Sequence, residues 1–246
     1  MTNAWGGKRA EQPWRKWRHV VKLDPDKQVA DELLAALGSS GTDAVFLGGT
    51  QGVTGEKVNA LYGRLQRFAP QVPVWQEISG TDSVIDGIDG YAVPVVLNAG
   101  SPHWLIGAHK EAILKYRPFI DWSKLLVEGY LVLNPDSAVA EVTEAQTSLT
   151  AEEAAAYAVA GEELFSLPVI YVEYSGTYGD PAMLQEVTRV LRQAHVFYGG
   201  GIDGYEKAWE MGGVADTIVV GNALYEANWR EVLRDTVRAV KGAEPK

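Results

Sequence analysis

Short apolar runs alternate along the chain with longer segments whose apolar residues recur at helical spacing. An apolar, β-branched run is typical of a strand buried on both faces, and a period near 3.6 is typical of a helix that packs on one face. The runs predict eight strands, over residues 20–23, 44–47, 74–78, 91–97, 130–133, 169–173, 196–198 and 217–220. The periodic segments predict helices over residues 31–37, 56–68, 104–116, 150–165, 182–193, 205–211 and 224–240.

This order of elements favours a single α/β domain, a modified TIM (β/α)8 barrel, over a doubly wound sheet. A chain of 246 residues has the usual length for such a barrel. Residues 79–89, between the third and fourth strands, are few and rich in Gly and Asp, so we expect the third helix to be missing or replaced by an irregular segment. Residues 134–148 exceed an ordinary turn between strand and helix, and we expect a functional loop there.

The N-terminal segment differs in charge from the rest of the chain. Residues 1–18 carry a balance of +4, which leaves −14 of the net charge of −10 on residues 19–246. We therefore divide the chain into a basic, tryptophan-containing segment, 1–18, and a barrel domain, 19–246. Trp5, Trp14 and Trp17 among the basic residues permit two interpretations. The segment is a solvated tail whose last tryptophan packs on the barrel base, or it makes peripheral contact with anionic lipid.

Composition excludes several classes of protein. The net negative charge argues against nucleic-acid binding, which requires a basic surface. No apolar run is long enough to span a bilayer, and the N-terminus lacks the apolar centre of a signal peptide. The absence of cysteine excludes disulfides and thiolate metal sites. We expect a cytoplasmic protein in which any metal ion is bound through oxygen.

The clearest chemical signal lies where the sixth predicted strand ends. The apolar run leads directly into Glu173, Tyr174, Ser175 and Gly176, shortly before an Asp-Pro pair that is typical of a helix start. Parallel barrel strands deliver the side chains at their carboxyl ends to one rim, where active sites form. Glu173 is therefore a candidate catalytic residue. The alternative is a structural carboxylate, buried and bound to backbone amides.

Glycines follow the last two predicted strands. Gly199, Gly200 and Gly201 come after the seventh strand, and Gly221 with Asn222 comes after the eighth. The phosphate site of a TIM barrel commonly lies in these two loops, where glycine lets backbone N–H groups approach phosphate oxygens. A triple glycine alone is weak evidence, because tight turns also use glycine for its backbone freedom. The phosphate prediction therefore depends on the two loops together.

The first two strands end in residues suited to a second phosphate group. Lys22 and Asp24 share one face of their strand by alternation, and Thr50 follows the next strand. Asp24 and Thr50 offer hard oxygen ligands, which suit Mg²⁺ shared with a diphosphate. The alternative for Asp24, which precedes Pro25, is simple capping of a turn or helix.

Several long motifs together resemble the geranylgeranylglyceryl phosphate synthase family, which includes the bacterial PcrB heptaprenylglyceryl phosphate synthases. They are residues 19–25, 48–54, 96–98, Tyr130 with 134–136, 171–180 and 197–202. The resemblance covers about residues 19 to 240 and implies a TIM barrel without its third helix. It also implies a Mg²⁺-dependent homodimeric prenyltransferase, which joins the C3 hydroxyl of sn-glycerol 1-phosphate to a polyprenyl diphosphate and releases diphosphate.

The resemblance also assigns roles at the matching positions. Asp24 and Thr50 would hold Mg²⁺, so that Asp24 acts in catalysis through the leaving diphosphate, and Glu173 would accept the proton of the attacking hydroxyl. The residues that would hold glycerol phosphate are Lys22, Tyr171, Val172, Glu173, Tyr174, Ser175, Gly176, Gly201, Gly221 and Asn222. The two interpretations differ only for Lys22. The resemblance places it at the glycerol phosphate, whereas the residues alone place it near the diphosphate.

Ala112 would set the length of the prenyl donor. The resemblance implies a bulky tryptophan at this position in archaeal geranylgeranyl enzymes and an alanine in bacterial heptaprenyl enzymes, and this chain has alanine. We therefore favour heptaprenyl over geranylgeranyl diphosphate. Residues 104–116, with Phe119, Trp122 and Tyr130, could line the prenyl groove, although such aromatic residues usually belong to a core.

Two other classes of protein remain alternatives. A phosphosugar isomerase would share the glycine-rich phosphate site but would not need the Asp24 and Thr50 metal pair. A non-catalytic phosphate- or lipid-binding barrel would bind the same ligands without releasing diphosphate. Mg²⁺ dependence distinguishes the first, and release of diphosphate distinguishes the second.

Overall fold

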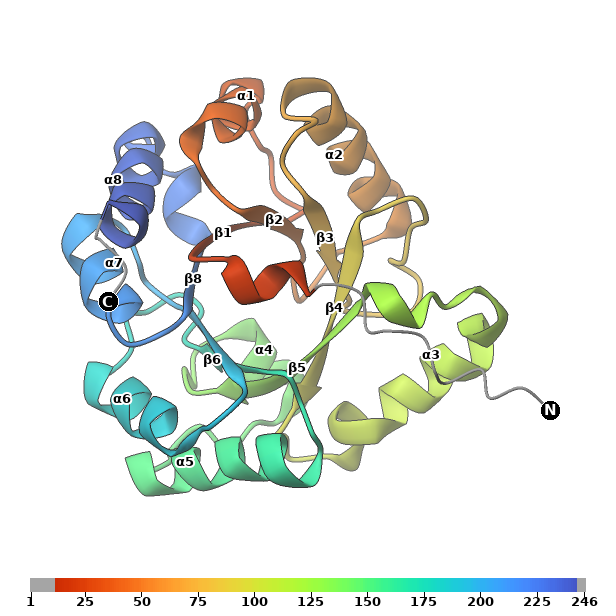
Figure 1. Ribbon diagram of the computed structural model, residues 1–246. Coiled ribbons are helices and arrows are strands. Elements are labelled where there is room, and N and C mark those ends of the chain that lie inside the picture. The colour runs from red at the N-terminus through yellow and green to blue at the C-terminus, as the bar shows by residue number, and fades with distance from the viewer. Residues whose placement is uncertain (1–11, 243–246) are drawn as a thin grey trace.

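The computed structural model describes residues 12–242 and shows a closed barrel of eight parallel strands surrounded by helices (Figure 1). The strands are β1 (His19–Leu23), β2 (Ala44–Leu47), β3 (Val74–Glu77), β4 (Gly90–Val96), β5 (Leu125–Val132), β6 (Val169–Glu173), β7 (His195–Gly199) and β8 (Thr217–Val220). The barrel closes because β1 pairs in parallel with both β2 and β8. The predicted single TIM barrel is confirmed.

Successive residues of each strand pack on opposite sides of the barrel wall. In β1, Val20 packs with Phe46 and Phe197 inside the barrel, whereas Val21 packs with Leu34 and Leu37 of the surrounding helices. Both clusters are apolar, which explains why the strands appear in the sequence as continuous apolar runs. The alternation brings every second residue near a strand end to the rim of the interior, where Lys22 of β1 lies.

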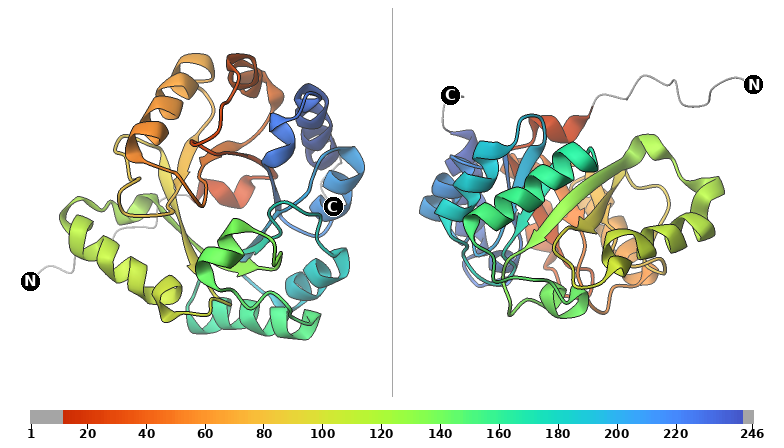
Figure 2. Two further views of the ribbon diagram at one scale, coloured as in Figure 1. Left: turned by 180° about the vertical axis from the view of Figure 1, so that it is seen from behind. Right: turned by 90° about the horizontal axis from the view of Figure 1, so that it is seen from below.

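Within the described residues, seven of the helices surround the barrel in the predicted order, and the short helix α4 (Ala138–Thr143) is an addition to them (Figures 1 and 2). The seven are α1 (Asp31–Ser40), α2 (Gly55–Phe68), α3 (Ala108–Tyr116), α5 (Ala151–Val159), α6 (Pro181–Val190), α7 (Tyr205–Gly212) and α8 (Trp229–Lys241). Helix α5 begins at the capping box of Thr150 and Glu153, and α6 begins after the side-chain cap of Asp180. The helix predicted over residues 224–240 divides into η6 (Asn222–Tyr225) and α8.

No helix forms over residues 78–89, between β3 and β4. The buried side chain of Gln76 fixes this irregular segment, since its Nε2 donates to the Ser83 carbonyl at 2.7 Å and its Oε1 accepts from the Ile85 amide at 3.1 Å. The expected loss of the third helix is confirmed. In the rear view (Figure 2), this part of the barrel faces α3, which stands away from the strands.

Two predicted boundaries need correction. Residues 134–148 are not wholly irregular, because Ser137 caps the short helix α4 with its hydroxyl. Strand β5 begins at Leu125, ahead of the predicted residue 130, because Leu125 to Gly129 continue the pairing with β4. The polar Glu128 and Gly129 concealed this part of the strand from a search for apolar runs.

The N-terminal boundary at residue 18 also differs from the structure. The short helix η1 (Pro13–Lys16), red in Figure 1, lies across one opening of the barrel. Trp14 and Trp17 are only 2% and 5% exposed, and Trp17 packs edge-on against Trp75 at 5.4 Å between ring centroids. These tryptophans belong to the barrel core and are not available to a membrane. The predicted lipid contact now rests on Trp5, Lys8 and Arg9, which lie outside the described residues.

Among residues 12–242, no helix combines the length and the apolar character needed to cross a bilayer.

Candidate active site

One cavity joins the polar rim of the barrel to an apolar region beside α3. Its volume is about 740 Å³, and its wall includes the predicted site residues Lys22, Thr50, Glu173, Ser175 and Ala112. The remaining wall between them comes mainly from β3, β4, β5, the irregular segment after β3, and α3. The cavity therefore connects charged groups with a long apolar surface.

Glu173 lies at the carboxyl end of β6 and is 3% exposed. One carboxyl oxygen accepts a hydrogen bond from the Ser175 hydroxyl, and the other lies 3.3 Å from the Tyr130 hydroxyl, whose single proton is shared between Glu173 and Glu77. Burial raises the pKa of Glu173 above its usual value, and the nearby charge of Lys22 opposes this rise. A carboxylate of raised pKa that faces a cavity is suited to accept a proton.

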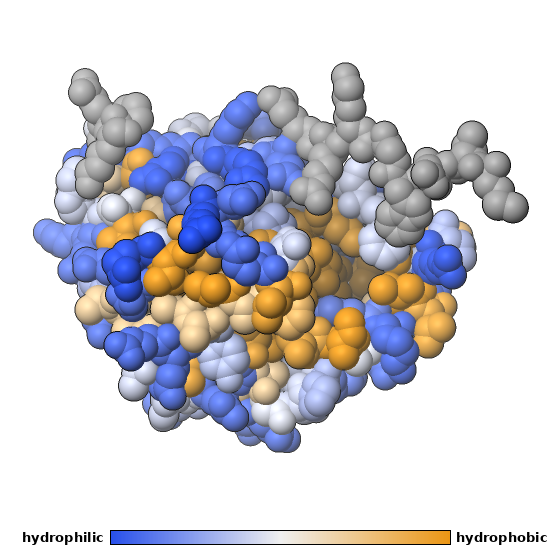
Figure 3. Space-filling view, turned by 60° about the horizontal axis from the view of Figure 1, so that its bottom comes forward, coloured by the Kyte–Doolittle hydropathy of each residue, from blue (hydrophilic) through white to orange (hydrophobic). Residues whose placement is uncertain are grey.

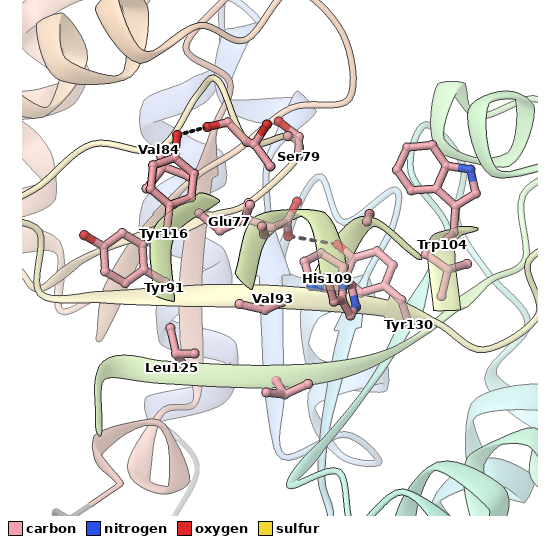
Figure 4. A pocket seen from close by; sticks show the side chains of 18 of the residues that line it. Glu77, Ser79, Val84, Tyr91, Val93, Trp104, His109, Tyr116, Leu125 and Tyr130 are labelled. Carbon is pink, nitrogen blue, oxygen red and sulfur yellow. Dashed lines mark hydrogen bonds between the residues drawn. The ribbon is translucent and has the colours of Figure 1, made fainter. Parts of the chain in front are cut away.

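An ion pair that the sequence analysis missed lies beside Glu173. The Lys22 ammonium contacts Glu77 at 2.7 Å, and the Tyr130 hydroxyl donates to Glu77 at 2.9 Å (Figure 4). Burial disfavours the charged form of Lys22, but the Glu77 and Glu173 carboxylates outweigh this effect and raise its pKa. Glu77 is the last residue of β3, as Glu173 is of β6, so the same position at a strand end could have identified it.

Glu128 adds a third carboxyl group to this region. It is fully buried on β5, and neither of its carboxyl oxygens has a hydrogen-bond partner within the described part of the chain. Burial, and next the charge of Glu77, raises the pKa of Glu128 well above its usual range. Burial therefore favours the neutral form of Glu128, whereas Glu77 is the carboxylate in direct contact with Lys22. No sequence signal distinguishes Glu128, because it lies inside a strand.

Asp24 and Thr50 lie at the adjacent ends of β1 and β2. A side chain at Gly49 would place its Cβ only 2.5 Å from Asp24 Oδ1, so the absence of a side chain there lets the carboxylate approach the β2 loop. The Asp26 amide donates to Asp24 Oδ1 at 2.9 Å, and the Asp24 amide donates to the Tyr225 hydroxyl at 2.8 Å. These contacts hold the carboxylate against Gly49, the residue before Thr50, although Asp24 itself does not line the cavity.

This pair of residues fits Mg²⁺ in its donor chemistry. Both supply hard oxygen atoms, and residues 12–242 contain no cluster of three or more His, Cys, Asp or Glu side chains that could enclose an ion. Mg²⁺ usually binds through one or two carboxylates and completes its coordination with water and substrate phosphates. A site of Asp24 and Thr50 therefore suits an ion that arrives with a diphosphate.

The predicted phosphate-binding glycines form tight turns at three neighbouring strand ends. Gly176 after β6 and Gly201 after β7 have φ angles of +88° and +58°. Any side chain at Gly201 would also meet the Tyr178 backbone, with its Cβ 2.6 Å from Tyr178 Cα. The Ser175 carbonyl accepts from Asn134 Nδ2 at 2.5 Å, which fixes the β6 loop. Gly221 completes the set at the end of β8.

Three predicted ligands have side chains that lie in the core. Tyr171 packs inside the barrel at 4.5 Å from the Tyr130 ring and 6.0 Å from the Phe197 ring. Val172 is fully buried, and the Tyr174 ring lies in the outer apolar cluster. None of these three side chains lines the cavity, but the Tyr171 hydroxyl hydrogen-bonds to the Glu173 carboxylate and so lies at the rim.

The far end of the cavity is apolar. Ala112 of α3 lines it, and Val93, Trp104 and Leu125 complete its wall (Figure 4). In Figure 3, hydrophobic surface surrounds the hollow, and Phe119 at its edge is 83% exposed. Ile106, Leu114 and Trp122 are also exposed, so residues 106–122 present several large apolar side chains at the surface, as binding surfaces often do.

Comparison with known proteins places the chain in a family. The sequence profile of the PcrB family matches residues 12–241. The chain belongs to this family. The heptaprenylglyceryl phosphate synthase of Brevibacillus brevis is 45% identical over 231 residues, which are 94% of this chain and 98% of that protein. The geranylgeranylglyceryl phosphate synthase of Halobacterium salinarum is 46% identical over 235 residues, with the same two shares.

A solved structure supports the fold of this PcrB-family chain. The (S)-3-O-geranylgeranylglyceryl phosphate synthase of Thermoplasma acidophilum, in complex with its substrate sn-glycerol-1-phosphate, superposes with a TM-score of 0.83 at 22% identity. The match covers 92% of this chain and 94% of that one. The family match begins at residue 12 and so includes the buried Trp14 and Trp17, in agreement with their place in the barrel. Overall identity does not decide the prenyl length, since relatives with either name are equally similar.

Proposed function

We propose that this protein joins the C3 hydroxyl of sn-glycerol 1-phosphate to a polyprenyl diphosphate, with formation of an ether and release of diphosphate. The observation that carries the proposal is the continuous cavity from Glu173 and Lys22 to Ala112. The apolar part of this cavity suits the hydrocarbon chain of a prenyl donor. A phosphosugar isomerase would have no use for it. The names of the relatives support the same substrates.

In the proposed reaction, the glycerol hydroxyl attacks C1 of the prenyl donor. The new C–O bond forms as the bond from C1 to the diphosphate oxygen breaks, and that electron pair leaves with the diphosphate. Glu173 accepts the hydroxyl proton, while Tyr130 and Ser175 orient its carboxylate through their hydroxyls. Glu77 holds Lys22, whose charge stabilises the Glu173 carboxylate before the proton transfer.

We further propose that Asp24 and Thr50 hold Mg²⁺. The bound ion would neutralise charge on the leaving diphosphate. Asp24 directly follows β1, which pairs with β8, so the diphosphate and the glycerol phosphate would occupy neighbouring parts of the rim. Asp24 would therefore contribute to catalysis through the bound ion and the leaving diphosphate, and not through contact with the attacking hydroxyl.

The glycerol phosphate would bind across the ends of β6, β7 and β8. Glycine N–H groups at Gly176, Gly201 and Gly221 would meet its phosphate, together with Ser175 and Asn222. Val172 and Tyr174 would contribute through backbone groups, because their side chains are buried, whereas Tyr171 would also present its hydroxyl beside Glu173. Lys22 would lie on the side of the glycerol hydroxyls, beside Glu173.

Heptaprenyl diphosphate is the donor we favour. Ala112 lines the cavity and leaves it open towards Phe119 and Trp122, where an indole in its place would narrow the path. Geranylgeranyl diphosphate is the second candidate, because the Halobacterium salinarum relative is as similar as the bacterial ones. We also propose a homodimer, which the exposed Leu114 and Phe119 could serve with apolar surface. Sedimentation analysis tests the dimer.

Product analysis tests the activity and the donor length together. Purified protein would be incubated with sn-glycerol 1-phosphate, Mg²⁺, and farnesyl, geranylgeranyl or heptaprenyl diphosphate. We expect an ether product and stoichiometric diphosphate, with the highest kcat/KM for the heptaprenyl donor. Binding of both substrates without diphosphate release would instead identify a non-catalytic lipid-phosphate-binding barrel. Full activity in the presence of a chelator would contradict the Mg²⁺ site.

A further inference from the structure

Lys27 lies at the proposed phosphate site and has no role in the proposed reaction so far. It belongs to the loop that follows β1, where its amide donates to the Asp24 carbonyl at 3.0 Å. Its ammonium group reaches across to the end of β8 and donates to Asn222 Oδ1 at 3.1 Å. It also lies 4.8 Å from the centre of the Tyr225 ring. The side chain is thus fixed at both ends of η6, directly after Gly221.

The contact with Lys27 determines how the Asn222 amide is oriented. A lysine ammonium can only donate hydrogen bonds, so the amide must present its oxygen to Lys27. The NH₂ group of Asn222 then points away from Lys27 and can donate to a bound anion. Lys27 itself keeps further N–H donors after this contact, because an ammonium group has three.

The charge of Lys27 is available to a ligand. The neighbouring Asp26 is already paired with Lys57, at 2.5 Å, and within residues 12–242 Lys27 forms no ion pair with a carboxylate. Lys22 differs in this respect, because Glu77 neutralises it at 2.7 Å. The glycine turns of the phosphate site supply N–H dipoles but no full positive charge. Lys27 places a full positive charge beside the turn at Gly221 and Asn222.

We propose that Lys27 binds the phosphate group of the glycerol phosphate acceptor and orients the Asn222 amide towards the same group. This inference rests on the proposed function and adds to it a side-chain cation that selects a phosphate dianion over a neutral polyol. Because Asp24 and Lys27 lie on one loop, the loop carries a residue for each of the two phosphate-bearing substrates. Tyr225 secures that loop through its hydroxyl, which accepts from the Asp24 amide.

The test compares Lys27→Gln with Lys27→Arg in the full-length protein. Gln removes the charge but retains a donor for Asn222, and Arg retains the charge. We expect Lys27→Gln to raise the KM for sn-glycerol 1-phosphate about tenfold, equivalent to about 1.4 kcal/mol, while kcat and the KM for the prenyl diphosphate change less than about twofold. Lys27→Arg should restore most of the affinity. Lys241→Gln, which removes a cation paired with Asp43 far from the glycine turns, is the matched control and should behave as wild type.

Calorimetric titration with sn-glycerol 1-phosphate alone separates this inference from the proposed function. Wild-type protein should bind the compound, and Lys27→Gln should bind it about tenfold more weakly. Unchanged affinity in Lys27→Gln would overturn the inference and leave the proposed function intact. Equal increases of KM for both substrates would also overturn it, because they would show that the substitution disturbs the whole loop after β1. Absence of binding to wild-type protein would overturn the proposed function itself.

Discussion

The two sides of the barrel rim are built in different ways. On the side of β6, β7, β8 and β1, glycine turns and short polar loops fix backbone groups tightly, as at Gly201 against Tyr178. On the side of β3, β4 and β5, the third helix is missing and a cavity lined by apolar side chains opens towards α3. In the proposed function, the polar side would recognise charge at fixed positions, whereas the apolar side would accommodate a flexible chain of variable length. Separate parts of the barrel would then control chemistry and donor length.

The loss of the third helix has a functional consequence in this comparison. A complete β/α unit would place a helix against β3 and β4, where the cavity wall now contains Ile78, Val84 and Ile85. Gln76 holds the irregular segment in place through two backbone hydrogen bonds, so the opening is a fixed feature of the fold. The polar side keeps its complete β/α units, which position the rim residues.

The largest effect is expected from Glu173→Gln on the polar side. The amide cannot accept the hydroxyl proton as a base, so kcat should fall by roughly 10²-fold or more. Steady-state kinetics with the heptaprenyl and geranylgeranyl donors would measure the loss, which should be equal for both. Thermal unfolding and glycerol phosphate titration serve as controls for folding and binding. Turnover close to wild type would remove Glu173 from the proposed mechanism.

Asp24→Asn should produce the next largest effect. It removes one charge from the proposed Mg²⁺ ligand while keeping the shape of the side chain, so activity at a fixed Mg²⁺ concentration should fall by at least about tenfold. A Mg²⁺ titration of the rate should show a higher half-maximal concentration, and the affinity for sn-glycerol 1-phosphate should change less. Equal losses in metal dependence and in glycerol phosphate binding would contradict the division between the two subsites.

The polar side was also the more predictable one. Glu173, Asp24 and the glycine turns all follow apolar strands, and such an abrupt change from apolar to polar residues is visible in a sequence. Glu77 occupies the same kind of position at the end of β3, on the other side of the rim, but its strand is followed by the unusual segment without a helix, and no motif drew attention to it. Glu128 could not be identified, because an isolated polar residue inside a strand does not reveal which face of the barrel wall it occupies.

The apolar side and the barrel base illustrate a different limit. A tryptophan near basic residues has the same local pattern on a membrane surface and in a core, and only the closed barrel shows that Trp14 and Trp17 fill its base. Helix α4 escaped prediction because Ala138 to Thr143 form too short a segment to show a period. In both cases, tertiary packing decides what local sequence leaves open.

Ala112→Trp should change donor preference with little effect on the polar side. The indole would occupy the cavity beyond α3 and displace the distal part of a heptaprenyl chain. Loss of burial for only two methylene groups, at about 0.8 kcal/mol each, would already exceed a tenfold change in relative kcat/KM. Glu111→Trp is the matched control, because Glu111 lies on the same helix, has a side chain that is 56% exposed and does not line the cavity. A tryptophan variant that uses both donors as wild type does would show that another residue limits chain length.

The smallest effect is expected when pH is varied and donor preference is measured. Burial raises the pKa of Glu173, so the base is present as the carboxylate above that pKa and is lost as pH falls through it. The acid limb of kcat should therefore lie above the usual carboxyl pKa of about 4.3, and Glu173→Gln should abolish this limb. Because the residues that line the cavity around Ala112 are mostly apolar, the ratio of heptaprenyl to geranylgeranyl kcat/KM should stay constant as Glu173 titrates. His109 also lines the cavity near Ala112, and burial lowers its pKa, so it gains a positive charge only at a lower pH than an exposed histidine does. A ratio that changes with the Glu173 titration would show that the two sides of the rim are coupled, and that donor length is selected partly where the proton is transferred.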